Sequence, residues 1–166
     1  MTLVSEALGD HHDLSAFVSG QPSLDSWLAQ HARGADARRV ARTFVWHYGD
    51  GVVVASYSLA AHVLMKDQLP RALGRGGPEH IPAVLLARLA LASRLQGEGL
   101  GSVVLAEALG RLVEATKAVA ARFVVVDAID AEAARFYEHH GFRPIPGTVR
   151  LVQKLSDVAA AVGGGV

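Results

Sequence analysis

The sequence predicts a single domain of the α/β class, in which helices and strands alternate along the chain. Three observations support this class: a β-hairpin pattern, a glycine-rich turn between an apolar strand and a long helix, and two further strands that flank a short helix. Of the 166 residues, 51% are hydrophobic and 19% are charged, which is a globular composition with enough chain for one core. We expect the domain to span residues 1–157 and a flexible tail to occupy 158–166.

The N-terminal half is expected to contain a helix and a hairpin. Ser23 predicts the N-cap of an amphipathic helix over 24–32, which runs on into an arginine-rich stretch. The segments 43–48 and 52–59 are rich in β-branched and aromatic residues and flank a Gly-Asp-Gly turn, so they predict a hairpin. Residues 66–80 carry several glycines and prolines and predict an irregular connection with room for one short helix.

The C-terminal half is expected to alternate strands and helices. The predicted elements are a buried strand over 81–91, a long helix over 100–115, a strand over 122–128, a helix capped by Asp130 that ends at about His140 before Gly141, and a strand over 148–155. No internal repeat or domain linker is visible.

The segment from Gln96 to Ser102 carries the strongest chemical signal. It places three glycines between a buried strand and the start of a long helix, where main-chain N–H groups and the helix dipole favour an anion. Neither a Walker loop nor the Gly-x-Gly-x-x-Gly dinucleotide pattern is present. A tight strand-to-helix corner without a ligand is the structural alternative.

Two separated motifs resemble those of the GNAT acetyltransferases. Gln96-x-x-Gly99-x-Gly101 is similar to the family's Gln/Arg-x-x-Gly-x-Gly/Ala turn, which binds the pyrophosphate of coenzyme A, and the segment 133–142 is similar to its Ala-x-x-Phe-Tyr-x-x-x-Gly-Phe segment. The resemblance implies a GNAT fold, with a central mixed, mostly antiparallel twisted sheet flanked by helices and the pyrophosphate turn after the fourth strand. It also implies acetyl-CoA as the cofactor.

A narrower resemblance is to the GNAT toxins of bacterial toxin–antitoxin pairs, which acetylate aminoacyl-tRNA. Their Phe-x-x-Gly-x-x-x-Leu-Asp-x-Trp-Leu opening is matched by Phe17, Gly20, Leu24, Asp25, Trp27 and Leu28. Arg88-Leu89-Ala90-Leu91 also resembles the subfamily's Arg-Leu-Ala-Val. Two departures are Ala92 and Ser93 in place of an acid, and Glu98 at a turn position that is often basic.

The resemblance implies roles for individual residues. Tyr137 is expected to be the general acid that protonates the departing thiolate, the alternative being a core tyrosine packed beside Phe136. The cofactor-binding residues are expected to be Leu89, Ala90, Leu91, Gln96, Gly97, Glu98, Gly99, Leu100, Gly101, Ser102, Asp130, Ala133 and Phe136.

The substrate prediction also has a chemical argument. No carboxylate or histidine lies within 85–93 to act as a base, so an α-amine with a pKa of about 7.7 to 8.0 is an easier substrate than a lysine with a pKa of about 10.4. A base could still come from elsewhere, and the candidates are His62, Glu79, His80 and His139. The arginines expected to bind tRNA phosphates are Arg33, Arg38, Arg39, Arg42, Arg71, Arg75 and Arg88. A solvated helix face is the alternative for the first four. Arg88 is unusual in an apolar strand, and we expect it at the substrate cleft or in a buried ion pair.

Further expectations concern partners and location. The toxin resemblance implies a ribbon-helix-helix antitoxin and a homodimer. With 16 basic and 16 acidic residues, no global charge favours nucleic acid or membrane, and the absence of cysteine suits the cytoplasm. The histidine spacing predicts no metal site.

Two other functions stay open at this level: a GNAT enzyme that acetylates a protein terminus or a small amine, and a non-catalytic acyl-CoA sensor on the same fold.

Overall fold

A computed structural model describes residues 2–163. The strands are β1 (Val4–Ala7), β2 (Arg42–His47), β3 (Ala55–Met65), β4 (His80–Leu91), β5 (Phe123–Asp127), β6 (Arg143–Pro144) and β7 (Arg150–Lys154). The helices are α1 (Pro22–Gln30), α2 (Ala32–Ala37), α3 (Arg71–Gly74), α4 (Leu100–Ala115), α5 (Ala131–His139) and α6 (Leu155–Gly163), with short 3₁₀ helices η1 (Lys66–Gln68) and η2 (Ser93–Leu95).

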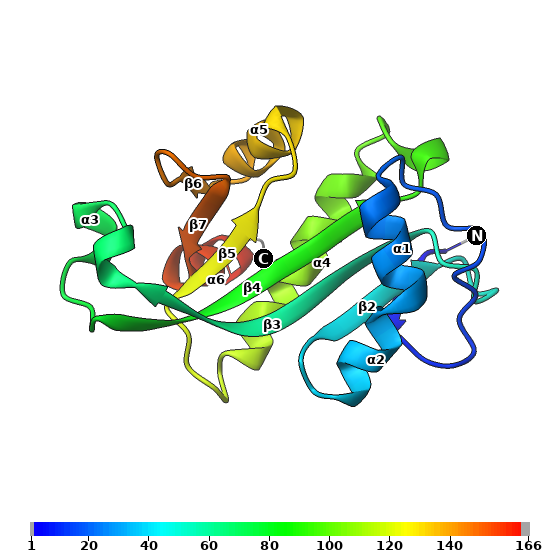
Figure 1. The fold of residues 1–166 in the computed structure, drawn as a ribbon, viewed down its shortest axis with the longest axis horizontal. Coiled ribbons are helices and arrows are strands. Elements are labelled where there is room, and N and C mark those ends of the chain that lie inside the picture. Colours follow the sequence, from blue (N-terminus) through cyan, green and yellow to red (C-terminus); the bar gives the residue numbers. More distant parts are fainter. Residues whose placement is uncertain (1, 164–166) are drawn as a thin grey trace. The chain divides into compact units, whose positions relative to one another are not determined.

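The strands form one mixed sheet in the order β1-β2-β3-β4-β5-β7-β6 (Figure 1). β1–β2, β2–β3, β5–β7 and β6–β7 are antiparallel, whereas β4–β5 is parallel. The predicted fold, a mostly antiparallel sheet flanked by helices, is therefore confirmed. The predicted hairpin is the β2–β3 pair, in which Phe44 lies opposite Tyr57.

The contacts divide this fold into two compact units. The first comprises residues up to 60 together with 86–108, and the second comprises 61–85 together with the chain from 109 onward. β3, β4 and α4 each contribute residues to both units.

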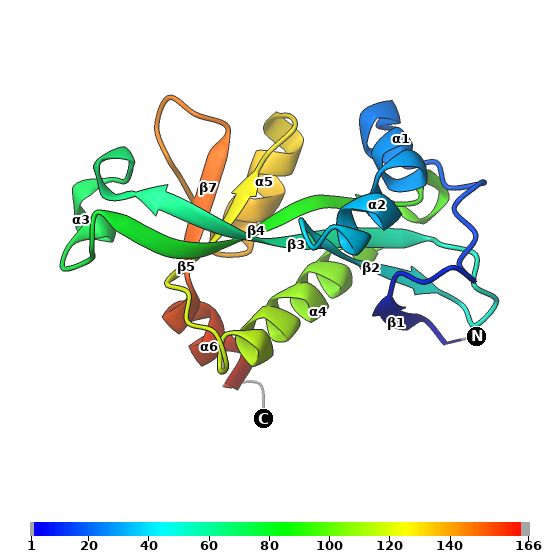
Figure 2. The same ribbon diagram turned by 60° about the horizontal axis from the view of Figure 1, so that its bottom comes forward.

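In the first unit, α1 and α2 lie on one face of β2 and β3, and the first half of α4 lies on the other (Figure 2). The predicted N-cap was wrong: α1 begins at Pro22, whose fixed φ suits the first helical position, and Ser23 lies inside the helix. Leu24 and Leu28 point into the core, as their spacing predicts. The helix also stops at Gln30, and α2 is a separate short helix.

In the second unit, α5 and α6 lie on opposite faces of β7 (Figure 2). The core cluster consists of Leu64, Leu69, Leu73, Ile81, Ala83, Phe123, Val125, Ile145 and Val152. Asp130 is the predicted cap of α5, because its Oδ1 accepts the N–H of Ala133 at 2.8 Å. Gly141 then adopts a φ of 94°, which permits the turn that ends the helix.

Two strands and one α-helix were not predicted. β1 and β6 are short edge strands, for which sequence periodicity is a weak signal. α6 occupies most of the expected tail. Val158 in this helix is only 1% exposed, and its burial favours the helix. Residues 164–166 of the expected tail lie outside the described part of the chain.

No helix between residues 2 and 163 is both long and apolar enough to cross a bilayer.

The turn at Gly141 gives a test of local stability. An added Cβ at Gly141 would lie 2.8 Å from the Gln153 Nε2 atom and would need the left-handed φ of 94°. We expect Gly141→Ala to lower the free energy of unfolding by roughly 1–2 kcal/mol, measured by denaturant titration. The control is Gly110→Ala within α4, where nothing lies within 4 Å and a gain of roughly 0.5–1 kcal/mol is expected. Equal effects of the two changes would contradict this account.

Candidate active site

The turn before α4 presents a row of unused main-chain donors in the first unit. Gly97 and Gly99 adopt φ values of 86° and 83°, which the absence of a side chain permits. Among the described residues, the N–H groups of 97–101 donate to no backbone carbonyl outside α4, as expected for residues that precede or begin a helix. No atom of the described chain lies within 4 Å of a Cβ position at either glycine. The turn is therefore open, exposed and suited to a phosphate.

The side chain of Gln96 holds this turn in place. Its Nε2 donates to the carbonyl oxygen of Ser19 at 2.7 Å and to that of Leu91 at 2.9 Å. Ser93 adds a bond from its Oγ to the carbonyl of Val18 at 3.1 Å. Both amide hydrogens of Gln96 are thus used by backbone carbonyls, so this residue of the predicted cofactor set stabilises the shape of the turn.

β4 loses its regular geometry just before the turn. The ladder with β5 joins only Ala83–Leu85 to Phe123–Val125, although both strands continue beyond it. Arg88 then adopts a φ of 57°, in the left-handed region that L-residues rarely occupy. The predicted splaying of β4 over 89–91 stays a prediction.

Tyr137 lies in α5 of the second unit and is only 8% exposed. Its ring contacts Phe136 and Phe142 edge-on, with centroids 5.4 and 5.5 Å away. Burial raises the pKa of Tyr137 to about 12, and its hydroxyl has no hydrogen-bond partner among residues 2–163. The phenol is therefore fully protonated at neutral pH and able to donate. Asp130, in contrast, uses its carboxylate as the cap of α5.

The predicted tRNA-binding arginines fall into two groups. Arg33 donates to the carbonyls of His12 and Gly9 at 2.7 and 3.3 Å, and Arg42 forms an ion pair with Asp36. The other five make no hydrogen bond or ion pair through their guanidinium groups within the described chain: Arg38, Arg39, Arg71, Arg75 and Arg88.

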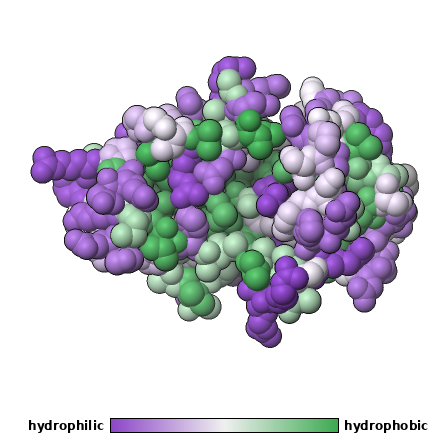
Figure 3. Space-filling model, viewed as in Figure 1, coloured by the Kyte–Doolittle hydropathy of each residue, from purple (hydrophilic) through white to green (hydrophobic). Residues whose placement is uncertain are grey.

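The connection between β3 and β4 has a largely hydrophilic surface (Figure 3). A cavity of about 680 Å³ within it is lined by Arg71 and Lys66 but also by Asp67 and Glu79. The two charges of each sign cancel, so this cavity is no concentrated anion site.

His62, one of the candidate bases, is not available as one in this arrangement. Arg150 binds both oxygens of Asp127, at 2.9 and 3.0 Å, and its Nη1 lies 2.9 Å from His62 Nε2. A guanidinium only donates, so Nε2 accepts and its lone pair is occupied. Burial, with the charge of Arg150, lowers the pKa of His62 and keeps the ring neutral. The remaining candidate bases are exposed: Glu79, His80 and His139.

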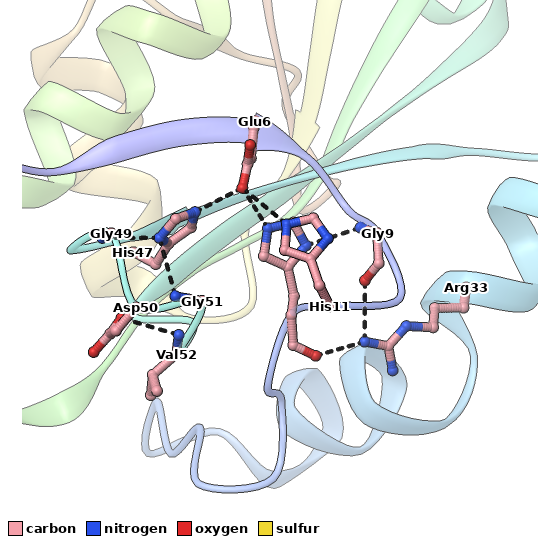
Figure 4. A network of polar contacts seen from close by, with 10 residues as sticks. Glu6, Gly9, His11, Arg33, His47, Gly49, Asp50, Gly51 and Val52 are labelled. Atoms are coloured by element: carbon pink, nitrogen blue, oxygen red, sulfur yellow. Dashed lines mark hydrogen bonds and ion pairs between the residues drawn. The ribbon is translucent and has the colours of Figure 1, made fainter.

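A cluster of histidines around Glu6 was not predicted (Figure 4). The Nε2 atoms of His12 and His47 both lie 2.7 Å from Glu6 Oε1, and that of His11 lies 3.3 Å away. These bonds, led by that from His12, lower the pKa of Glu6 to about 2. The paired histidines are visible in the sequence, but only the pairing of β1 with β2 brings His47 to them.

Glu6, His11 and His12 also have a spacing that suits a metal ion. The hydrogen bonds argue against one, because Nδ1 of His12 accepts the N–H of Gly9 at 2.8 Å and Nδ1 of His47 accepts that of Gly49 at 3.0 Å. With Nδ1 acting as an acceptor, each ring carries a proton on Nε2, directed at Glu6, and a protonated nitrogen has no lone pair for a metal.

Comparison with known proteins adds independent information. No family model matches the chain. A curated relative from Mycobacterium tuberculosis, the tRNA-acetylating toxin, is 36% identical over 157 residues, which cover 94% of each chain.

Two solved structures are also similar. AtaT complexed with acetyl-methionyl-tRNAfMet has 26% identity and a TM-score of 0.88 over 96% of this chain and 99% of that one. An AtaT mutant bound to the C-terminus of the antitoxin AtaR and acetyl-CoA has 25% identity and a TM-score of 0.84 over 98% and 99%. Because the sequence match extends over nearly the whole of both chains, this chain belongs to the family of tRNA-acetylating GNAT toxins.

Proposed function

We propose that the chain transfers an acetyl group from acetyl-CoA to the α-amine of aminoacyl-tRNA, and thereby blocks translation as the toxin of a toxin–antitoxin pair. The observation that carries this proposal is the row of open N–H groups over 97–101, held at the start of α4. Its relatives support the substrate, since one is named for acetylating tRNA and another holds acetyl-methionyl-tRNA.

The open turn fits the diphosphate of coenzyme A. Several N–H groups converge at the positive end of a 16-residue helix, and neither Gly97 nor Gly99 has an atom near its Cβ position that would crowd a phosphate. The side chain of Glu98 adds a negative charge at the same turn, which opposes binding unless it points to solvent. The rest of the predicted cofactor set, in β4 and α5, would contact the remainder of the molecule.

The chemistry requires few protein groups. When bound, acetyl-CoA supplies the acetyl group as a thioester. The amine nitrogen forms a bond to the acetyl carbon as the carbon–sulfur bond breaks, and a main-chain N–H within 89–91 would stabilise the carbonyl oxygen. Tyr137 would donate its proton to the sulfur. The amine would lose a proton to solvent, and solvent would return a proton to the phenolate of Tyr137.

The tRNA would meet arginines whose donors are unused by the described residues. Arg38 and Arg39 are such cations in the stretch that follows α1, and Arg71 and Arg75 are such cations beyond β3. Arg33 already binds backbone carbonyls and Arg42 already pairs with Asp36, so we expect both mainly to stabilise the local backbone.

We expect the antitoxin to be a ribbon-helix-helix protein, the active form to be a homodimer and the location to be the cytoplasm.

Direct assay tests the reaction and its acid together. The protein is incubated with labelled acetyl-CoA and total charged tRNA, and the aminoacyl ends are analysed by mass. We expect N-acetylated aminoacyl groups, and a loss of roughly 10²- to 10⁴-fold in kcat for Tyr137→Phe. The rate of acetylation, measured by rapid mixing, should rise with pH as the amine loses its proton. It should then stay level through pH 10, because Tyr137, with a pKa of about 12, is still protonated there.

Other outcomes of that assay have defined meanings. Full activity of Tyr137→Phe would remove the proposed acid. Acetylation of peptide amines but not of charged tRNA would favour the wider GNAT activity. Binding of acetyl-CoA without any turnover would favour the sensor.

The role of Gln96 gives a second test. Gln96→Glu keeps the shape but turns a carboxylate toward the carbonyls of Ser19 and Leu91, so the turn should loosen. We expect the dissociation constant of acetyl-CoA to rise about tenfold by calorimetry, equal to about 1.4 kcal/mol. Gln68→Glu, an exposed site with the same charge change, is the control and should bind normally. Normal binding by Gln96→Glu would show that the turn does not depend on this side chain.

A third test concerns the tRNA surface. Replacing Arg38 and Arg39 by glutamine should reduce the slope of log affinity against log salt by roughly 0.7–0.9 for each phosphate that the protein no longer neutralises. Affinity for charged tRNA is measured by filter binding over a range of salt. Neutralising Lys117 and Arg143, two exposed cations outside the predicted tRNA-binding set, is the matched control. Equal salt slopes for the native protein, the variant and the control would show that tRNA does not bind at Arg38 and Arg39.

A further inference from the structure

The backbone at Arg88 is strained within a strand. Its φ of 57° is in a region that disfavours a side chain by roughly 1–2 kcal/mol, whereas glycine adopts it freely. β4 nevertheless carries one of the longest side chains at this point. Backbone strain of this kind is typical of active sites and ligand-binding positions.

The guanidinium of Arg88 stacks on Trp27 of α1. Its central carbon lies 4.4 Å from the centroid of the indole ring, within the range of a cation–π contact. The buried neighbours Leu24 and Leu28 fix α1, and therefore the ring, against the sheet. The stack holds a long, partly exposed side chain in one place.

The donors of this stack find no acceptor in the described chain. Within residues 2–163, neither the Arg88 guanidinium nor the Trp27 Nε1 takes part in a hydrogen bond, and no acid pairs with Arg88. Asp25, the acid of α1, instead accepts from the N–H of Ser19 at 3.1 Å and from its Oγ at 2.6 Å. Partial burial lowers the pKa of Arg88. A positioned cation of this kind is suited to an anionic ligand.

We propose that Arg88, held by Trp27, binds the phosphodiester immediately 5′ to the aminoacylated adenosine of the tRNA. This inference rests on the proposed function. Arg88 is two residues, or about 7 Å, before Ala90 along the strand, and Ala90 is the middle of the segment proposed to face the thioester carbonyl. In an aminoacyl-tRNA the anion nearest to the reacting amine is that phosphodiester, one ribose away. The guanidinium offers paired donors for two phosphate oxygens.

The test compares two short substrates that differ by that phosphate. One is aminoacyl-adenosine and the other is the same group on cytidylyl-adenosine, each with an aminoacyl group that the native protein acetylates on tRNA. We expect the native protein to favour the phosphodiester substrate about tenfold in kcat/KM. Arg88→Gly, which suits the left-handed φ and preserves the bend, should abolish that preference by lowering kcat/KM on the phosphodiester substrate.

Further variants separate the guanidinium from its surroundings. Arg88→Lys should keep part of the preference, because a point charge remains without the paired donors. Trp27→Leu should weaken it by freeing the side chain. Lys117→Gln is the control and should keep it in full. With whole charged tRNA, Arg88→Gly should reduce the salt slope by roughly 0.7, the value for one single-strand contact.

The possible failures are distinct. If the native protein acetylates no charged tRNA, the proposed function falls and this inference falls with it. If it does, but Arg88→Gly keeps the preference and the salt slope, the inference alone is wrong. A preference lost in Trp27→Leu but kept in Arg88→Gly would assign the contact to base stacking on the indole instead, and a rate lost equally on both substrates would assign Arg88 to the backbone of β4.

Discussion

The proposed chemistry depends on main-chain N–H groups that find no carbonyl to bind within the described chain. A strand that enters a helix through a glycine turn leaves the first helical donors without partners, and the positive φ of Gly97 and Gly99 keeps the chain from covering them. The turn is held from behind by Gln96, which uses both amide hydrogens on backbone carbonyls. A phosphate can therefore be bound without any basic residue in the turn.

The proposed reaction likewise depends on few ionisable side chains. Tyr137 needs no partner to stay protonated, because its apolar neighbours already raise the pKa of the phenol. His62 is kept from acting as a base by the guanidinium of Arg150. Such a protein suits an amine with a substantial neutral fraction at physiological pH, and the α-amine of aminoacyl-tRNA is far less basic than a lysine.

Arginine serves two purposes in this chain. Arg33 and Arg150 are consumed by internal acceptors and stabilise local structure, whereas Arg88 is held by an aromatic ring with its donors unused by residues 2–163. The number of arginines in a segment therefore does not measure its capacity to bind phosphate. The acceptors already present within the fold decide which guanidinium groups remain available.

The sequence by itself determined the class of fold, the glycine turn, the cap at Asp130 and the long helix after the turn. These features depend on residues close together in the chain, through hydrophobic period, glycine φ and capping, so local pattern is sufficient. The short strands β1 and β6 and the helix α6 were not predicted, because pairing and burial stabilise them more than local propensity does.

Only the folded chain shows which side chains meet. The Glu6 cluster joins residues from β1, its following loop and β2, and the stack of Arg88 on Trp27 joins segments about sixty residues apart in the chain. Likewise, sequence could identify Arg33 and Arg38 as equivalent basic residues, but only the fold shows that Arg33 is bound to backbone carbonyls. Such contacts depend on the path of the chain between distant residues, which no local pattern specifies.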